Sequence, residues 1–239
     1  MKNFVIISNS DPQYIFFKNK LEKIGFKNYF IINNKIKKRF FFNFKLSIKN
    51  QKFFYFLKYY LLKFFFLKKY TNLYLKKKKE FFDFFRKNNN YYKTHNLSHI
   101  KKFKNKTLIV FGSPFLNQHS IRNFKKCYNV HMGDLPKYSG LKSFERMYLK
   151  EKYIGFSIHE INEQIDSGAI NLKKKIKINN KLSPFVNYIN LYLYSFDVIE
   201  KIIKNKIKLR PKKKNYQNKY YGFQFTELEY KKFLKKFKD

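Results

Sequence analysis

Two polar side chains at positions 129 and 131 have the spacing needed to act on one small group. Asn129 and His131 are two residues apart on a segment that reads as extended, and side chains alternate between the two faces of a strand. Both side chains therefore point to the same side. The Leu-Pro-Lys-Tyr-Ser-Gly stretch at 135–140 then forces a turn, because Pro fixes φ and Gly permits left-handed geometry. We expect this turn to be shaped around a ligand.

A carboxylate follows downstream, in the Ile-Asp-Ser-Gly segment at 165–168. With it, the pattern resembles the folate-dependent formyltransferases, which carry Asn-x-His-x-Ser-Leu-Leu-Pro-x-Tyr-x-Gly, a Thr-Gly-Val-Thr-type strand and Asp-x-Gly. The interval between the His and the Asp is also close to the family's usual one. The resemblance is clear over residues 107–170 and weak elsewhere. The matching positions are Asn129, His131, Leu135, Pro136, Tyr138, Gly140, the strand at 155–159, Asp166 and Gly168.

The resemblance implies transfer of a formyl group from 10-formyltetrahydrofolate to an amine. This reaction develops an oxyanion and a positively charged nitrogen. Asn129 and His131 would donate hydrogen bonds to the oxyanion, each such donor being worth about 3 kcal/mol. Asp166 would take the proton from the nitrogen, directly or through water, and would also favour a charged His131. The three side chains, an amide, an imidazole and a carboxylate, must therefore meet around one carbonyl group.

The formyl donor is expected beyond the strand at 107–111, because open sheets bind ligands at the carboxyl ends of their strands. The resemblance assigns this contact to the loop after the strand and to two residues before Asp166. A plain strand-to-helix connector is the alternative for the loop. The expected cofactor-binding residues are Gly112, Ser113, Pro114, Phe115, Gln164 and Ile165.

The acceptor side is expected to include Asp134, Lys137, Tyr138 and His159, although His159 could instead serve packing. Two departures from the family pattern fall here. Gly-Asp at 133–134 stands where Ser-Leu is common, which removes a hydroxyl and adds a charge. Ser139 replaces a frequent Arg. These changes bear on the identity of the acceptor more than on the reaction.

A nucleotide-linked amino sugar is the expected acceptor, by elimination. About 30 residues follow the catalytic region, too few for the barrel domain that helps methionyl-tRNA formyltransferases hold tRNA. The loop after the first strand, at 8–11, lacks the Gly-rich phosphate loop of the glycinamide ribonucleotide enzymes. Two alternatives stay open: a methionyl-tRNA formyltransferase, and a non-catalytic protein that binds polyanions or a membrane surface.

The net charge of +39 would ordinarily indicate nucleic acid or an anionic membrane as a partner. Only 5 of the 54 basic residues are Arg, however, and Lys, Phe, Ile, Asn and Tyr are enriched together. This shared bias indicates a drift towards A- and T-rich codons. Arg would be expected if bidentate phosphate recognition had been selected. A specific nucleic-acid role, including tRNA, is therefore the less favoured interpretation.

The remaining composition favours a cytoplasmic protein. Cys127 is the only cysteine, so an internal disulfide is excluded. We interpret Cys127 as a small buried residue. No signal peptide is indicated, and the most apolar stretch, 53–67, is broken by lysines and falls short of a membrane span. No cluster has metal-ligand spacing, so no metal is expected. A homodimer is left open.

Alternation of strand and helix patterns predicts an α/β fold, with a Rossmann-like, open, mostly parallel sheet. Strands are expected at 4–8, 29–32, 107–111 and 153–161. Helices are expected from Pro12, capped by Asp11, towards Gly25, at 141–150, and at 183–206 with Ser183 as N-cap. No Gly-x-Gly-x-x-Gly follows the first strand, so a dinucleotide site is not indicated.

Residues 35–106 carry too many Lys and Phe residues for a clear period. Helices are expected at 53–66 and 98–104, a loop at 88–90, and a solvated face for the lysine run at 76–79. The chain is expected to divide into a catalytic domain at 1–207 and a short C-terminal extension at 208–239. The extension should contain an extended piece followed by a small helix.

Overall fold

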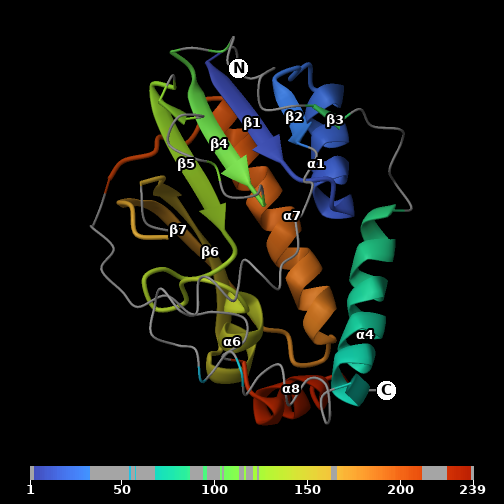
Figure 1. Cartoon of the computed structure of the whole chain (residues 1–239). Coiled ribbons are helices and arrows are strands. Elements are labelled where there is room, and N and C mark those ends of the chain that lie inside the picture. The colour runs from blue at the N-terminus through green and yellow to red at the C-terminus, as the bar shows by residue number, and fades with distance from the viewer. Residues whose placement is uncertain are drawn as a thin grey trace.

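A computed structural model describes residues 3–32, 54, 57, 68–86, 94–95, 103, 105–112, 116, 121–122, 124–162, 166–211 and 225–237. Its centre is a seven-stranded sheet with the strand order β3-β2-β1-β4-β5-β6-β7 (Figure 1). The pairs from β3 to β5 are parallel, whereas β6 and β7 are antiparallel to their neighbours. The predicted α/β fold with an open, mostly parallel sheet is confirmed.

Strands β1, β2 and β4 are short apolar runs, as expected for strands that are covered on both faces. The two antiparallel strands are longer, and lysines occupy the exposed positions of the edge strand. The strands are β1 (Phe4–Ser8), β2 (Tyr29–Ile32), β3 (Thr94–His95), β4 (Thr107–Phe111), β5 (Lys126–His131), β6 (Tyr153–Glu160) and β7 (Ile170–Lys177).

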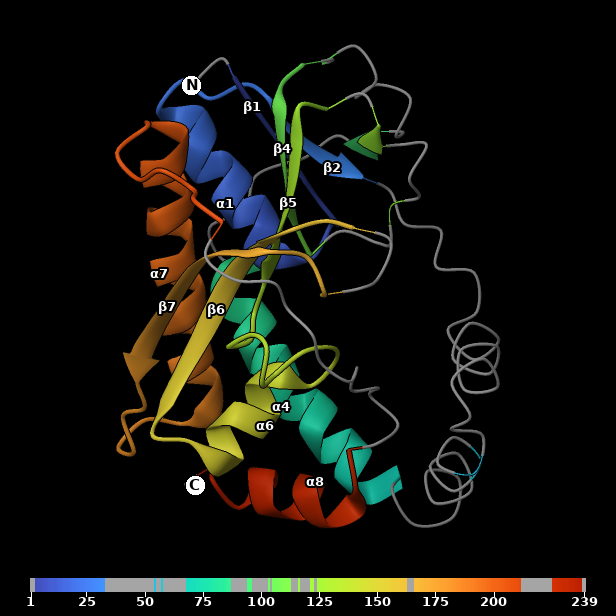
Figure 2. The ribbon, with the colours of Figure 1, turned by 90° about the vertical axis from the view of Figure 1, so that its left-hand side faces the viewer.

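Helices α1 (Pro12–Lys23) and α7 (Pro184–Ile203) lie against one face of the sheet, which Figure 2 shows nearly edge on. Helix α4 (Lys68–Arg86) packs against both of them. Helix α6 (Ser143–Lys150) precedes β6, and α8 (Glu227–Leu234) lies across the ends of α4 and α6 (Figure 1). The long described helices therefore cover one face of the sheet.

Aromatic rings fill the core between the sheet and these helices. Phe17 of α1 stacks on Phe196 of α7 at 4.4 Å between ring centroids, and Phe144 of α6 stacks on Tyr188 of α7 at 3.9 Å. A second, smaller apolar cluster lies on the other face of the sheet. Cys127 packs against this second cluster, and burial raises the pKa of its thiol to about 12, which fits the expected packing role.

The two predicted helix caps differ in their side-chain hydrogen bonds. Ser183 accepts a hydrogen bond from the backbone N–H of Val186 and Pro184 is the first residue of α7, as predicted. Asp11 is the N-cap residue of α1, as predicted, but its side chain makes no capping hydrogen bond. Its carboxylate instead accepts from the Asn9 amide nitrogen at 3.1 Å. The helices predicted at 53–66 and 98–104, and the loop at 88–90, fall almost wholly outside the described residues.

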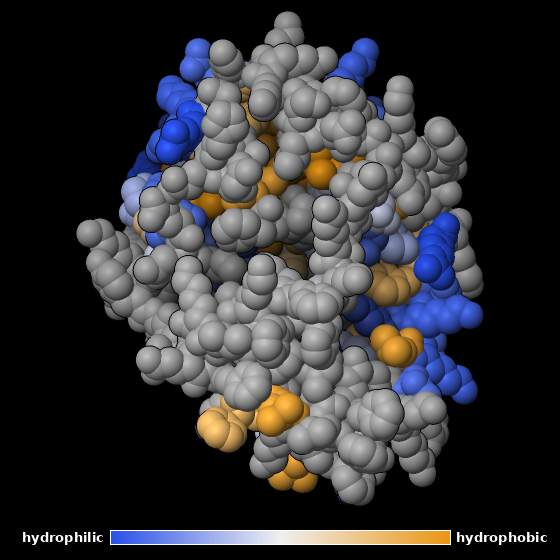
Figure 3. All heavy atoms as spheres, viewed as in Figure 1, coloured by the Kyte–Doolittle hydropathy of each residue, from blue (hydrophilic) through white to orange (hydrophobic). Residues whose placement is uncertain are grey.

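The lysine run at 76–79 belongs to α4, and the prediction of a solvated face is only partly confirmed. Lys76 and Lys79 are exposed, whereas Lys77 and Lys78 lie 5.8 Å and 5.1 Å from aromatic ring centroids. Figure 3 shows hydrophilic surface interrupted by apolar atoms along this edge of the molecule. Among the described helices, none has the length and apolar composition to cross a bilayer.

The C-terminal segment shares its apolar contacts with the rest of the molecule. Phe225, Tyr230 and Phe233 are buried in the same cluster as the residues of α4, α6 and α7. The small helix predicted near the C-terminus is present as α8. A capping box begins it, in which the side chains of Thr226 and Glu229 each bond the backbone N–H of the other. The domain boundary at 207 and 208 stays a prediction.

Candidate active site

The register of the sheet brings three polar side chains onto one face. On β5, Tyr128 and Val130 pack towards the helices, so Asn129 and His131 point to the opposite face. On β6, His159 lies directly across from Asn129 in the antiparallel pair. Directly opposed side chains in such a pair are close neighbours. The Asn129 amide nitrogen accordingly lies 3.1 Å from Nε2 of His159.

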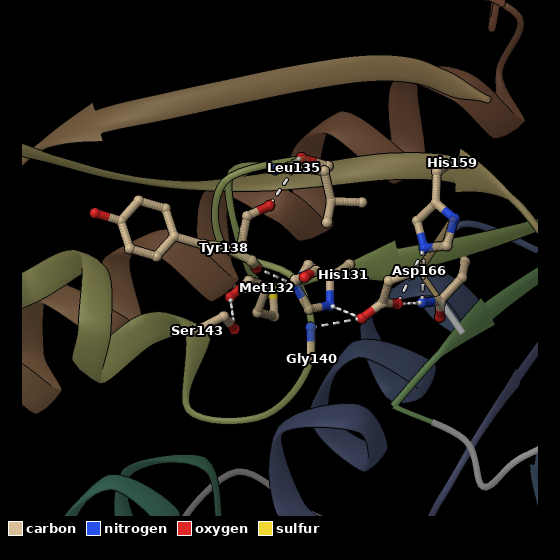
Figure 4. A network of polar contacts seen from close by, with 12 residues as sticks. His131, Met132, Leu135, Tyr138, Gly140, Ser143, His159 and Asp166 are labelled. Atoms are coloured by element: carbon tan, nitrogen blue, oxygen red, sulfur yellow. Dashed lines mark hydrogen bonds and ion pairs between the residues drawn. The ribbon is translucent and has the colours of Figure 1, made fainter. Parts of the chain in front are cut away.

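Asp166 joins this group from the segment between β6 and β7. It has a left-handed backbone with φ of 57° and is buried. Its carboxylate lies 3.4 Å from Nδ1 of His131, 3.5 Å from Nδ2 of Asn129 and 3.4 Å from Nε2 of His159. The backbone N–H of Gly140 also donates to it at 2.9 Å (Figure 4). The expected meeting of the amide, the imidazole and the carboxylate is therefore present in the structure.

The surroundings of Asp166 hold its carboxylate in the charged form. Burial alone would raise its pKa, but the charge of His131, the contact with His159 and the Gly140 N–H act in the opposite direction. The net result is a pKa well below the usual range for an aspartate. At neutral pH, a negative charge is thus fixed beside two imidazole rings.

The ring of His131 is bonded on both sides. Its Nε2 lies 2.7 Å from the carbonyl oxygen of Tyr138, which can only accept, so Nε2 donates. Its Nδ1 faces Asp166. On Asn129, the amide nitrogen is directed at His159 and Asp166. The N–H groups of the cluster are thus engaged by protein acceptors, and a ligand must replace at least one of these bonds to receive a hydrogen bond.

Gly133 allows this orientation of His131. A Cβ at residue 133 would overlap the Tyr138 carbonyl oxygen and would lie only 2.5 Å from Nε2 of His131. The space that a side chain would need is thus occupied by the hydrogen bond between the ring and the carbonyl. This gives a physical reason for the Gly at a position where Ser is common in the resembling family.

The loop after Gly133 is fastened to the antiparallel part of the sheet. Ser157 of β6 accepts from the Leu135 N–H at 3.0 Å and donates to the Gly133 carbonyl at 2.8 Å. Asp134 forms ion pairs of 2.5 Å with both Lys173 and Lys175 of β7. The Leu135–Pro136 peptide bond is cis. Asp134, expected on the acceptor side, is therefore engaged by the edge strand of the sheet.

The side chains of Lys137 and Tyr138 both reach Glu151, at the end of α6, with contacts of 2.6 Å and 2.5 Å. The Tyr138 ring consequently points away from Asp166, as Figure 4 shows. Burial and the Glu151 contact raise the pKa of the Tyr138 hydroxyl well above its usual range. Tyr138 contacts His131 through its backbone carbonyl, and its predicted role in acceptor binding stays a prediction.

Of the expected folate-binding residues, only Gly112 lies in the described part of the chain. It follows β4 with φ of +64°, and its Cα rests on the ring of Tyr14, with which an added Cβ would overlap. The others, Ser113, Pro114, Phe115, Gln164 and Ile165, lie outside the described residues. Among the described residues, no group of three or more His, Cys, Asp or Glu side chains could hold a metal ion.

Sequence reasoning underrated His159 and missed Gly140 and Ser157 as parts of this network. His159 is only 2% exposed, and its Nδ1 donates to the Glu160 carbonyl at 2.8 Å. It therefore lies behind Asn129 and Asp166, on the side away from solvent. The alternation of β6 places 157 and 159 on one face, but the antiparallel register that brings them to Asn129 and His131 is not visible in the sequence.

Comparisons with known proteins identify the family. A family model described as "Formyl transferase" matches residues 66–185, about half of the chain. A methionyl-tRNA formyltransferase of Kosmotoga olearia is 44% identical over 55 residues, which are 23% of this chain and 18% of that protein. A phosphoribosylglycinamide formyltransferase of Haemophilus influenzae is 39% identical over 54 residues, which are 22% and 26%. The matches thus span about a quarter or less of these relatives.

Solved structures agree in fold. An N-formyltransferase from Helicobacter canadensis, in complex with folinic acid and dTDP-3-aminofucose, has a TM-score of 0.59 at 16% identity and covers 99% of this chain and 81% of its own. A 4-N formyltransferase from Francisella tularensis has a TM-score of 0.55 at 16% identity, with 98% and 88% covered. The match of the family model shows that the chain belongs to the formyl transferase family.

Proposed function

We propose that this protein is an enzyme that transfers a formyl group from 10-formyltetrahydrofolate to an amine. The observation that carries the proposal is the cluster of Asn129, His131 and an ionised Asp166 on one face of the sheet, at the carboxyl end of β5. Ligands of open α/β sheets bind at such ends. Membership of the formyl transferase family supports the reaction class.

In the proposed reaction, His131 and Asn129 donate hydrogen bonds to the oxygen of the formyl group as negative charge develops on it. Fixed donors aimed at such an oxygen are worth about 3 kcal/mol each. The Asp166 carboxylate lies 3.4 Å from Nδ1 of His131 and orients the ring. A carboxylate with so low a pKa is a weak base. The bond from the amine nitrogen to the formyl carbon forms, the bond from that carbon to the folate nitrogen breaks, and the proton that the amine loses passes to the folate nitrogen, directly or through water. We therefore assign Asp166 an electrostatic role beside the positively charged amine nitrogen, ahead of proton removal.

Ligand binding must open the closed network of hydrogen bonds. The longest of its bonds joins the Asn129 amide to Asp166 at 3.5 Å, and Asn129 is more exposed than His131 or Asp166. We therefore propose that Asn129 releases this bond first. The Nε2–H of His131 becomes available to donate to the ligand when the ring turns away from the Tyr138 carbonyl.

The residues present fit the reacting end of a formyl donor, because two hydrogen-bond donors and a fixed negative charge surround one point on the sheet. When bound, the folate supplies the activated formyl group. Gly112 lies at the carboxyl end of β4 and packs on Tyr14, in the space that a side chain would need. Residues 113–115 and 164–165 would complete the folate contacts.

For the acceptor, we propose the amine of a small molecule, with a nucleotide-linked amino sugar as the first candidate. The support is that the solved structures with similar folds include several named as sugar formyltransferases and an N-formyltransferase in complex with dTDP-3-aminofucose. Methionyl-tRNA is the second candidate, supported by the net charge of +39 and by local identity to methionyl-tRNA formyltransferases. A cytoplasmic location and a homodimer stay predictions.

Parallel assays separate these candidates. The protein is incubated with 10-formyltetrahydrofolate and either a dTDP-linked amino sugar or charged initiator tRNA, and the formylated product is quantified. His131→Ala and Asn129→Ala serve as controls and should each lower kcat by roughly 100-fold. Exclusive turnover of tRNA would replace the sugar with tRNA as the acceptor. Absence of turnover and of folate binding, with strongly salt-dependent binding to DNA or anionic vesicles, would leave the non-catalytic alternative.

A further inference from the structure

One lysine connects the C-terminal helix to the loop that holds Asp166. Lys142 lies two residues after Gly140 and immediately before α6, with a left-handed φ of 58°. Helix α8 lies across the ends of α4 and α6 at this point (Figures 1 and 2). The side chain of Lys142 is largely buried where the three helices meet.

Aromatic rings from two distant segments surround the Lys142 ammonium group. Its Nζ lies 3.8 Å from the ring centroid of Tyr74 on α4, and 5.3 Å and 5.7 Å from those of Tyr230 and Phe225 at α8. Cations within about 6 Å of such ring faces are attracted to them. Lys142 is therefore held by residues about 70 positions before it and 80 to 90 after it in the sequence.

A buried carboxylate completes this cage. Glu145 is 7% exposed, lies 3.0 Å from the Lys142 ammonium, and accepts from the Tyr74 hydroxyl at 2.5 Å. Burial would raise the pKa of Glu145, but Lys142 and Tyr74 outweigh this and lower it. A charged pair in such surroundings tolerates little displacement, because either partner alone would be buried without compensation.

The turn from Ser139 to Ser143 links this cage to the active site. At one end, the Gly140 N–H donates to Asp166. The same turn is held by Arg146, which donates to the Ser139 carbonyl at 3.0 Å, and by Ser143, which donates to the Met132 carbonyl at 2.6 Å. Since only Leu141 separates Gly140 from Lys142, a shift of Lys142 moves the Gly140 N–H as well.

We propose that Lys142 is a positioning residue. Its ammonium group, fixed by Tyr74, Glu145 and the aromatic rings at α8, holds the turn at 139–143 so that the Gly140 N–H stays on the Asp166 carboxylate. The C-terminal helix thereby supports the geometry of the active site, although it contributes no residue to it. The effect on catalysis rests on the proposed function, whereas the effect on Gly140 does not.

The test uses Lys142→Met/Glu145→Gln in the full chain, since removing both charges leaves no unpaired ion in the core. Lys142→Arg should retain the cation and its contacts with the rings. Lys150→Met is the matched control, because Lys150 is at the other end of α6 and also pairs with a residue of α8, Glu229, at 3.9 Å, but its side chain is 59% exposed. Tyr230→Leu weakens the cage from α8 without altering a charge.

The first readout is the amide signal of Gly140 in an NMR spectrum of protein labelled with 15N-glycine. The protein contains seven glycines, so the spectrum has few signals to assign. We expect hydrogen exchange at Gly140 to rise at least roughly 10-fold in the double variant and in Tyr230→Leu, and to stay near wild type in Lys142→Arg and Lys150→Met. An unchanged Gly140 amide in a folded double variant would overturn the proposal, whatever the activity.

The second readout is formylation. Misplacement of the carboxylate should lower kcat by roughly 10-fold to 100-fold with KM nearly unchanged, and Lys142→Arg should restore most of the loss. A cage that only stabilises the fold would lower the melting temperature in the variants and leave kcat and Gly140 unaffected, which would also overturn the proposal. If wild type formylates no acceptor, the proposed function fails, and the exchange of Gly140 still decides the role of Lys142.

Discussion

At the scale of single residues, Asp166 organises the site. Its carboxylate contacts both histidines, the Asn129 amide and the Gly140 N–H. The Asn129 amide and the Gly140 N–H both donate to it, so the charge of Asp166 compensates for the burial of several polar groups at once. A neutral residue at position 166 would leave these donors without their common acceptor.

Asp166→Asn should therefore destabilise the protein by about 3 kcal/mol near neutral pH, as expected when one partner of a buried ion pair is removed. The pH dependence has a definite sign. Because the pKa of Asp166 is lower in the folded state, its stabilisation is fully present above the unfolded value of about 3.9 and declines as pH falls towards the folded pKa. Urea unfolding of wild type and variant between pH 3 and pH 7 measures this difference.

Asp197→Asn is the control for this series, since Asp197 lies on the surface of α7 in an ion pair with Lys20. Its effect should be small, as for exposed pairs generally. A difference between wild type and Asp166→Asn that stayed constant down to pH 3 would contradict a lowered pKa for Asp166.

The sequence was sufficient to predict that Asn129, His131 and Asp166 lie close together, because the period of a strand and a recognisable motif constrain their positions. It was not sufficient for His159 or Gly140. The contact with His159 depends on the register between β5 and β6, and the Gly140 bond depends on the path of a loop. Both are set by tertiary packing. For the same reason, the contact of the Tyr138 hydroxyl with Glu151 was not visible in the sequence, and a role of Tyr138 in acceptor binding stays a prediction.

At the scale of the structural element, the loop from Gly133 to Tyr138 sets the orientation of His131. Gly133→Ser should break the bond between Nε2 of His131 and the Tyr138 carbonyl, because the new Cβ would overlap both atoms. Overpacking of this kind typically costs about 1–3 kcal/mol. A crystal structure of the variant should show the His131 ring rotated, and thermal unfolding should show the loss of stability.

Gly25→Ala is the matched control for this variant. Gly25 has φ of +81°, and no atom lies within 4 Å of the position that a Cβ would take there, so the substitution strains the backbone without touching the site. It should lower stability by about 1–2 kcal/mol and leave His131 in place. If the His131 ring kept its contact with the Tyr138 carbonyl in Gly133→Ser, the prediction would be wrong, because the loop and not the ring would have moved.

Elements with strong local signals were predicted well, and elements fixed by long-range contacts were not. Helix α7 has a Ser N-cap, a Pro at its first position and an apolar stripe, and its start was predicted correctly. Helix α4 was missed because lysines and phenylalanines recur in it too densely for a period to emerge. Strand β7 was missed because lysines occupy its exposed positions. Such residues are depleted in strands generally but protect an edge strand from pairing with other chains.

At the scale of the whole molecule, the basic charge is distributed over many elements, and some of it is used internally. Lys173 and Lys175 neutralise Asp134, Lys142 pairs with Glu145, and Lys137 pairs with Glu151. These lysines hold together the loops around the site. The net charge by itself therefore does not identify a polyanion as the partner.

The packing of α8 predicts that the chain folds as one cooperative unit. Phe225, Tyr230, Phe233 and Phe237 are buried against α4, α6 and α7. Burying one such side chain contributes roughly 1.5–3 kcal/mol, so the four together approach the whole stability of a typical domain, roughly 5–15 kcal/mol. A chain truncated after Pro211 should therefore lose its cooperative thermal transition and bind a hydrophobic dye. In the full chain, Thr226→Ala removes only the cap of α8, at a cost of about 1 kcal/mol, and should lower the melting temperature by roughly 2–4 °C. A truncated chain that melted like wild type would contradict this account and would support an independent catalytic domain ending near residue 207.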